Sequence, residues 1–322
     1  MRSGWRKFWP LIKVLLTLAV VGAVAWQFTT ILRNPDLWQR PLRPAPPWLA
    51  AAVGLYLVGL GFSAVFWYWL LRALGQQPRI RATVRAYYVG QLGRYVPGKV
   101  VGVLFRARLM SGPGVRMSVA VLTVVYESLA TLTSGAFLAV LLFISQAWDH
   151  GAMGWKALGL LAVVAIPLLP GVFNRLVEWI SRPFLPADAA PLPRVRSLSL
   201  SIGLALAGCG WVVQGAGLWA LVDAVQPAAW PWSWEAWAHA TAFIALAYVA
   251  GFLVVAVPGG LGVREFLLQQ FLAAELATQL GPPQAAAIAV VVALLSRLLW
   301  LTADVLAAGV FYWLPGQARA SD

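Results

Sequence analysis

Long apolar runs separated by short polar connections dominate the chain. A helix needs about 20 largely apolar residues to cross the hydrocarbon layer of a bilayer. Such runs are found at 10–32, 48–74, 117–146, 154–173, 198–223, 237–257 and 284–314. Two further apolar segments, 82–110 and 260–280, are interrupted, and counting the second as a crossing raises the number of spans from seven to eight. The pattern predicts an all-α polytopic membrane protein in which residues 1–322 form a single transmembrane domain.

The two interrupted segments carry similar motifs. In each, Val-Pro-Gly is followed within a few residues by another glycine and then by basic side chains. The helix-breaking residues are Pro97 and Gly98 in the first segment, and Pro258, Gly259, Gly260 and Gly262 in the second. Broken helices at membrane depth are tolerated where they line a wet cavity or are buried in protein. Paired breaks of this kind indicate a transporter site, and helix starts beside them suit an anion.

The spacing of the motifs predicts an internal repeat with halves at about 48–146 and 198–314, each containing a re-entrant segment. Four spans lie between the motifs in this count, so both segments should enter from the same side, as in parallel repeats. One misplaced span would make the repeats inverted. The alternative for each motif is a tight turn between two spans.

Composition supports the membrane interpretation. Hydrophobic residues make up 61% of the chain and charged residues 11%, whereas an average soluble domain is about 25% charged. The net charge of +13 does not indicate nucleic-acid binding, because the basic residues lie between or just outside the apolar runs. That distribution is typical of topology signals and of contacts with anionic lipids.

Basic residues also predict the orientation. Arg2, Arg6 and Lys7 place the N-terminus in the cytoplasm, before a first span that is too long for a signal-peptide core and is expected to stay uncleaved. The basic connections at 72–116 and 175–196 should then be cytoplasmic, and the acidic connection 223–235 should lie outside. The short connection 33–47, which holds three arginines, is the exception.

Three ionisable residues lie at membrane depth, and they are Glu127, Arg297 and Asp304. Each would cost about 2.5–3.5 kcal/mol without a partner. In one interpretation Arg297 pairs with Glu127 or Asp304 and locks the bundle. In the other, Arg297 binds a lipid phosphate, with a carboxylate as counter-charge. Arg106, Arg264 and the glycines of both breaks are further candidates for phosphate binding, and Glu265 for charge pairing or proton coupling.

Tryptophans and metal-binding residue types add little chemistry. Trp230, Trp232, Trp234 and Trp237 favour a position in the headgroup layer, and the alternative is a carbohydrate-stacking site. The single cysteine, Cys209, and two scattered histidines do not suggest a metal centre. We therefore expect no cofactor, no metal and no catalytic residues.

The order of these motifs resembles the transmembrane region of lysylphosphatidylglycerol synthases, a flippase-like membrane family, over roughly 10–314. The residues that match are Pro97, Gly98, Arg106, Glu127, Pro258, Gly259, Gly260, Gly262, Glu265 and Arg297. Tyr126 departs from the arginine that often precedes the central glutamate, which should loosen the charge pairing of that site. The aminoacyl-transferase domain of full synthases is not expected in this chain.

The resemblance implies a multi-pass protein of a bacterial or archaeal plasma membrane that moves a lipid between leaflets. The lipid could be a phospholipid, an aminoacylated phospholipid, a polyprenyl-phosphate carrier or a related lipid. No ATP-binding phosphate loop occurs in the sequence. Two alternatives are a non-transporting scaffold for lipid or glycan biosynthesis enzymes and a membrane-embedded lipid-modifying enzyme.

Overall fold

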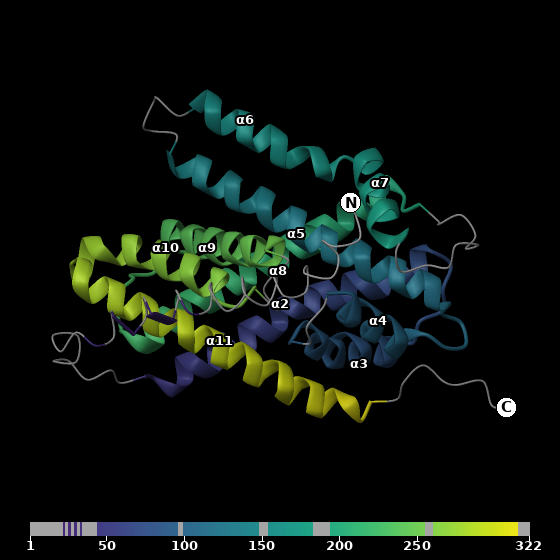
Figure 1. Ribbon diagram of the computed structural model, residues 1–322, viewed down its shortest axis with the longest axis horizontal. Helices are drawn as coiled ribbons and strands as arrows, with labels where there is room; N and C mark the ends of the chain where they lie inside the picture. Colours follow the sequence, from purple (N-terminus) through teal and green to yellow (C-terminus); the bar gives the residue numbers. More distant parts are fainter. Residues whose placement is uncertain are drawn as a thin grey trace, which may run out of the picture.

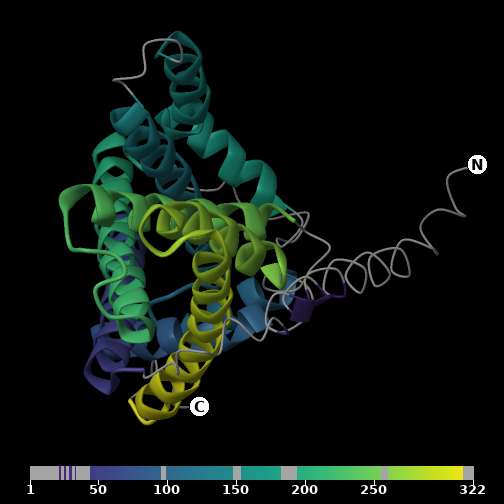
Figure 2. The same ribbon diagram turned by 90° about the vertical axis from the view of Figure 1, so that its left-hand side faces the viewer.

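The protein is a bundle of α-helices, seen along two directions in Figures 1 and 2. A computed structural model describes residues 44–95, 99–147, 154–182, 194–254 and 260–314, together with isolated positions between 22 and 33. The helices are α2 (Pro46–Ala73), α3 (Ile80–Gly90), η2 (Gln91–Tyr95), α4 (Lys99–Met110), α5 (Met117–Ala147), α6 (Gly154–Ala165), η4 (Ile166–Leu168), α7 (Pro170–Ser181), α8 (Ser197–Val225), α9 (Trp234–Leu253), α10 (Val263–Leu280) and α11 (Pro282–Tyr312). The predicted all-α membrane fold is therefore confirmed.

Within the described residues, five helices are long and apolar enough to cross a membrane: α2, α5, α8, α9 and α11. A sixth crossing is possible if α6 and α7, which are bent by 63° at their junction, form one span. Pro167 and Pro170 explain this bend, since proline removes a helical N–H and disfavours a helical residue before it. The predicted span 10–32 falls outside the described residues apart from isolated positions. The predicted total of seven or eight spans is thus not confirmed.

Helices α2 and α8 pack antiparallel along a seam of glycines. Gly203, Gly210 and Gly217 recur every seven residues on α8 and face α2. Small residues allow membrane helices to approach closely and gain dispersion energy where no hydrophobic effect operates between them. A Cβ added to Gly210 would lie 2.9 Å from the backbone oxygen of Gly59, so the two backbones are in direct contact.

The close contact along this seam predicts that a larger side chain at Gly210 lowers the stability of the protein. Gly210→Val should destabilise the protein by about 1–3 kcal/mol, because overpacking would push the two backbones apart. Gly208→Val is the matched control, since a Cβ at Gly208 on the same helix meets nothing within 4 Å. Thermal unfolding in detergent measures both variants. Equal midpoints for the two would show that the seam does not hold α2 against α8.

The first interrupted segment folds back on itself as a hairpin. Helices α3 and α4 contain 11 and 12 residues, or about 16–18 Å, which is little more than half of the hydrocarbon layer. A Cβ on Gly93 would lie 2.9 Å from the Cα of Gly102, and one on Gly90 would lie 2.9 Å from Cγ of Arg106. These contacts pair the arms in antiparallel register. Val96, Pro97 and Gly98 lie outside the described residues.

The second interrupted segment is also the tip of a hairpin, formed by α9 and α10. Phe243 stacks on Phe271, and His239 contacts Glu275, which again is an antiparallel register. Near the tip, a Cβ on Gly260 would lie 2.9 Å from both Cα and the carbonyl oxygen of Gly251. Residues 255–259, including Pro258 and Gly259, lie outside the described residues.

The two hairpins enter the bundle from opposite ends. In Figure 1 the turn between α10 and α11 lies at the left, whereas the connections that flank α3 and α4 lie at the right. Along the chain, α5, the bent α6–α7 pair and α8 lie between the hairpins, and α9, itself long enough to cross a membrane, is the first arm of the second hairpin. Entry from opposite ends differs from the same-side entry expected when four spans separate the motifs. A repeat relating the two halves stays a prediction.

The two ends of the bundle differ in charge. At the end where α2 finishes and α8 starts, nine arginines are exposed: Arg72, Arg79, Arg81, Arg108, Arg116, Arg175, Arg182, Arg194 and Arg196. The two basic connections predicted to share a side thus lie together. The opposite end holds Asp223, the exposed Glu235 and a row of contacting indole rings from Trp48 through Trp219 to Trp232. Whether these tryptophans lie in the headgroup layer or form a carbohydrate-stacking site stays a prediction.

Candidate functional site

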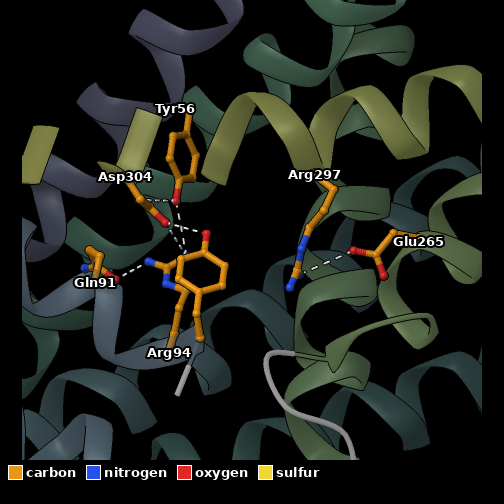
Figure 3. Close-up of polar contacts among 7 residues, drawn as sticks. Tyr56, Gln91, Arg94, Glu265, Arg297 and Asp304 are labelled. Atoms are coloured by element: carbon orange, nitrogen blue, oxygen red, sulfur yellow. Dashed lines mark hydrogen bonds and ion pairs between the residues drawn. The ribbon is translucent and has the colours of Figure 1, made fainter. Parts of the chain in front are cut away.

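Three side chains of α11 organise a polar cluster inside the bundle. Arg297, Trp300 and Asp304 follow one another at intervals of three and four residues, so they share a face of the helix. The predicted common face of Arg297 and Asp304 is therefore present. Asp304 pairs with the first hairpin and Arg297 pairs with the second, and Figure 3 shows the two ion pairs side by side along α11.

Asp304 holds the tip of the first hairpin. Its carboxylate is 1% exposed and accepts hydrogen bonds from the hydroxyls of Tyr56, at 2.9 Å, and Tyr95, at 2.7 Å. Nη1 of Arg94 lies 3.8 Å from the same carboxylate and donates to the Tyr56 oxygen at 3.2 Å. Arg94 also contacts the Gln91 amide oxygen. One buried negative charge thereby fixes residues of α2 and of the 3₁₀ turn η2.

Glu265 holds the start of the second hairpin's return arm. Its carboxylate accepts the backbone N–H of Gly262 at 2.7 Å, which caps α10, and accepts from Nη1 of Arg297 at 3.4 Å. The chain reaches this cap through Gly260 and Gly262, whose φ angles of +67° and +84° are costly for residues with a Cβ. The same carboxylate therefore stabilises an unusual turn and joins α10 to α11.

The two tips are connected through aromatic faces. The guanidinium carbon of Arg297 lies 5.6 Å from the centre of the Tyr95 ring, and Tyr95 itself binds Asp304. Trp300 stacks on Tyr56 at 5.3 Å on one side of the cluster. The guanidinium of Arg264 lies 3.5 Å from the Trp300 ring. Opposite hairpins thus meet on one stretch of α11, within two helical turns.

A second charged centre lies at the first hairpin and consists of Arg106 and Glu127. Nη1 of Arg106 donates to Glu127 at 2.7 Å, and both side chains are less than 10% exposed. The guanidinium carbon lies 4.4 Å from the Trp67 ring centre and 4.2 Å from that of Tyr87, whose hydroxyl donates to Glu127 at 3.2 Å. This pair ties α4 to α5 and is enclosed by aromatic rings.

The pairing of the membrane-depth charges differs from the expectation. Arg297 pairs with Glu265, whereas Glu127 pairs with Arg106 and Asp304 pairs with Arg94. Both partners expected for Arg297 lie in uninterrupted spans, whereas Glu265, which was a candidate for charge pairing without an assigned partner, follows the second break. The first interrupted segment supplies Arg94 and Arg106. Glu127 has a charge partner despite the tyrosine at position 126, because Arg106 reaches it from another helix. Tyr126 instead contacts Asn174.

Sequence reasoning missed the roles of Arg94, Tyr95 and Tyr56. Arg94 was assigned only to the topology signals, although it lies two residues before the first Val-Pro-Gly motif, and Arg264 lies five residues after the second. An arginine close to each break was the available signal. Tyr56 gave none, since a tyrosine in an apolar run is common. In the described part of the chain, no group of three His, Cys, Asp or Glu could hold a metal ion.

Comparison with known protein families agrees with this architecture. The family model described as "Lysylphosphatidylglycerol synthase TM region" matches residues 11–303. The chain belongs to this family. No curated protein matches the chain significantly. Membership in the lysylphosphatidylglycerol synthase TM family, together with the long apolar helices, establishes a multi-pass membrane protein with a lipid-related role.

The match extends over both hairpins and over Arg297, and it ends one residue before Asp304. In this member of the lysylphosphatidylglycerol synthase TM family, the site therefore combines residues inside the matched region with one just beyond it. The arrangement can hold each hairpin tip by a separate ion pair, and a continuous series of aromatic contacts lies between the two pairs.

Proposed function

We propose that this protein moves a phosphate-bearing lipid between the two leaflets of the membrane without changing it covalently. The supporting observation is that two hairpins from opposite ends of the bundle meet, through charged tips, on one face of α11. Charges at this depth are costly unless they serve a polar path. Transporter sites are commonly built where interrupted helices meet near the midplane of the bilayer.

The geometry suggests how access could alternate between leaflets. Asp304 holds the tip that comes from the arginine-rich end, and the Glu265–Arg297 pair holds the tip that comes from the other end. Releasing one pair would open the bundle towards one end while the second pair keeps the other end closed. A headgroup would pass the charged cluster while its acyl chains remain in the bilayer.

The distribution of charge supports a proposal for the orientation. Basic residues concentrate on the cytoplasmic side of membrane proteins, so we propose that the arginine-rich end faces the cytoplasm. The N-terminus would then be cytoplasmic, in a bacterial or archaeal plasma membrane. The base of the α3–α4 hairpin would face the cytoplasm, and the turn between α10 and α11 would face outwards.

Reconstituted vesicles test the proposal. Acyl-labelled phosphatidylglycerol is followed by quenching with a membrane-impermeant reductant. Arg297→Gln should slow movement at least about tenfold, equivalent to about 1.4 kcal/mol of barrier, because α10 loses its charged contact with α11. Arg108→Gln, an exposed arginine on α4, is the control and should keep the wild-type rate.

Two outcomes would count against transport. One is a wild-type rate equal to that of protein-free vesicles, which would favour a scaffold role. The other is an Arg297→Gln rate equal to that of Arg108→Gln, which would remove the charged cluster from the pathway. Chemically altered phosphatidylglycerol in the vesicles would instead indicate an enzyme.

A further inference from the structure

The charges of the α11 cluster do not cancel. Among the described residues it contains three guanidinium groups, from Arg94, Arg264 and Arg297, and two carboxylates, from Glu265 and Asp304. Arg94 pairs with Asp304, and Arg297 pairs with Glu265. Arg264 interacts electrostatically with Glu265 and with both of the other arginines. The cluster therefore carries one positive charge in excess, and Arg264 is the member outside the two ion pairs.

Arg264 is also buried with part of its hydrogen-bonding capacity unused. The residue is 6% exposed, and its Nε and Nη2 atoms have no hydrogen-bond partner among the described residues. Burying an unsatisfied donor costs about 1–3 kcal/mol, and more when the group is charged. Buried polar groups in native proteins generally have a partner, which can be a protein group, an ordered water, an ion or a ligand.

The orientation of the guanidinium defines what it can bind. Its face covers the Trp300 ring at 3.5 Å, which leaves the edges of the plane for hydrogen bonds. Nε and Nη2 lie on the same edge, where their N–H bonds run nearly parallel. That edge matches two oxygens of one oxyanion in a bidentate contact. Arg264 also lies in the first turn of α10, where the helix dipole favours negative charge.

We propose that Arg264 is the phosphate-binding residue of this protein and that it selects a singly charged phosphodiester, the linkage of a glycerophospholipid. One phosphodiester supplies two acceptor oxygens and a single negative charge, which neutralises the excess of the cluster. A phosphomonoester, doubly charged above its second pKa of about 6, would leave a buried negative charge. Arg297, the residue singled out by sequence, serves to hold α10 on α11.

The same reasoning separates Arg264 from Arg106. Arg106 also has unpartnered Nε and Nη2 atoms, but Glu127 neutralises it at 2.7 Å. A phosphodiester bound there would add an uncompensated charge. Access to Arg264 requires the hairpin tips to move away from α11, and in this respect the inference rests on the proposed transport.

Native mass spectrometry of the purified full chain tests the assignment. At pH 8 the wild type should bind phosphatidylglycerol at least about tenfold more tightly than diacylglycerol of the same acyl chains, and more tightly than phosphatidic acid. Arg264→Gln should lower phosphatidylglycerol affinity about tenfold and leave diacylglycerol binding unchanged. Arg108→Gln should retain wild-type affinity for both lipids.

Several results would overturn the inference. One is that phosphatidic acid or oleate binds as tightly as phosphatidylglycerol. Another is that millimolar inorganic phosphate displaces the lipid, which would show a site for free phosphate. If Arg264→Gln does not fold, the wild-type order of affinities decides alone. Lipid movement is measured separately, in the vesicle assay. If phosphatidylglycerol binds through Arg264 but does not move between leaflets, only the transport proposal is refuted. If it moves, but Arg264→Gln binds it with wild-type affinity, only the present inference is refuted.

Discussion

Glu127→Ala is expected to unfold the protein or to lower its stability by about 3–5 kcal/mol, the cost of leaving a buried charge without its partner. Arg106 would remain enclosed between the rings of Trp67 and Tyr87, with no carboxylate within reach among the described residues. In a bilayer the guanidinium cannot turn to water from this position. Urea or thermal unfolding in detergent, with size-exclusion chromatography, measures the effect.

The controls separate charge from packing. Tyr87→Phe removes a single hydrogen bond to Glu127 and should cost only about 1 kcal/mol. The double variant Arg106→Met, Glu127→Leu removes both charges and should recover most of the stability, since apolar pairs often replace buried ion pairs without loss. If Glu127→Ala melts at the wild-type midpoint, the pair does not stabilise the hairpin, and a proton-coupling role for Glu127 becomes the better interpretation.

Asp304→Ala should abolish lipid movement and lower stability by about 3 kcal/mol. The substitution leaves Arg94 without its carboxylate and removes the acceptor of two buried hydroxyls, those of Tyr56 and Tyr95. The tip of the first hairpin would lose its attachment to α11. Vesicle assays and unfolding in detergent measure the two effects on the same preparations.

A double variant shows whether the attachment matters for transport itself. Arg94→Gln with Asp304→Asn removes both charges, so stability should recover to within about 1 kcal/mol of the wild type. Lipid movement should stay low, because the ion pair that is proposed to break and re-form at this tip is absent. Additive losses of stability in the two single variants would show that Arg94 and Asp304 do not interact, and recovery of movement would remove the pair from the transport cycle.

Local patterns in the sequence predicted the long helices well. The expected span 117–146 became α5 (Met117–Ala147), and 198–223 became α8 (Ser197–Val225), because a run of apolar residues has one stable form in lipid. The breaks at both Val-Pro-Gly motifs were also identifiable, since proline and glycine act on the backbone locally. Segment 154–173 was less predictable, because two prolines bend it without ending its apolar run.

The partners of the charged residues could not be predicted with the same success. Which carboxylate faces Arg297 depends on the direction of each hairpin, and one misassigned crossing reverses it. Counting four spans between the motifs placed both hairpins on the same side, and it left Glu265, a candidate for charge pairing, without an assigned partner. Arg94 and Arg264 became visible as a set only when the structure brought the two tips to α11.

The length of α11 bears on how the protein fits its membrane. With 31 residues the helix is about 46 Å long, whereas the hydrocarbon layer is about 30 Å thick. Mismatch of this size is relieved by tilting, and Figure 1 shows α11 running obliquely past α2. Arg297 and Asp304 then differ in lateral position as well as in depth. A thicker bilayer would reduce the tilt of α11 and so increase the difference in depth between these two residues.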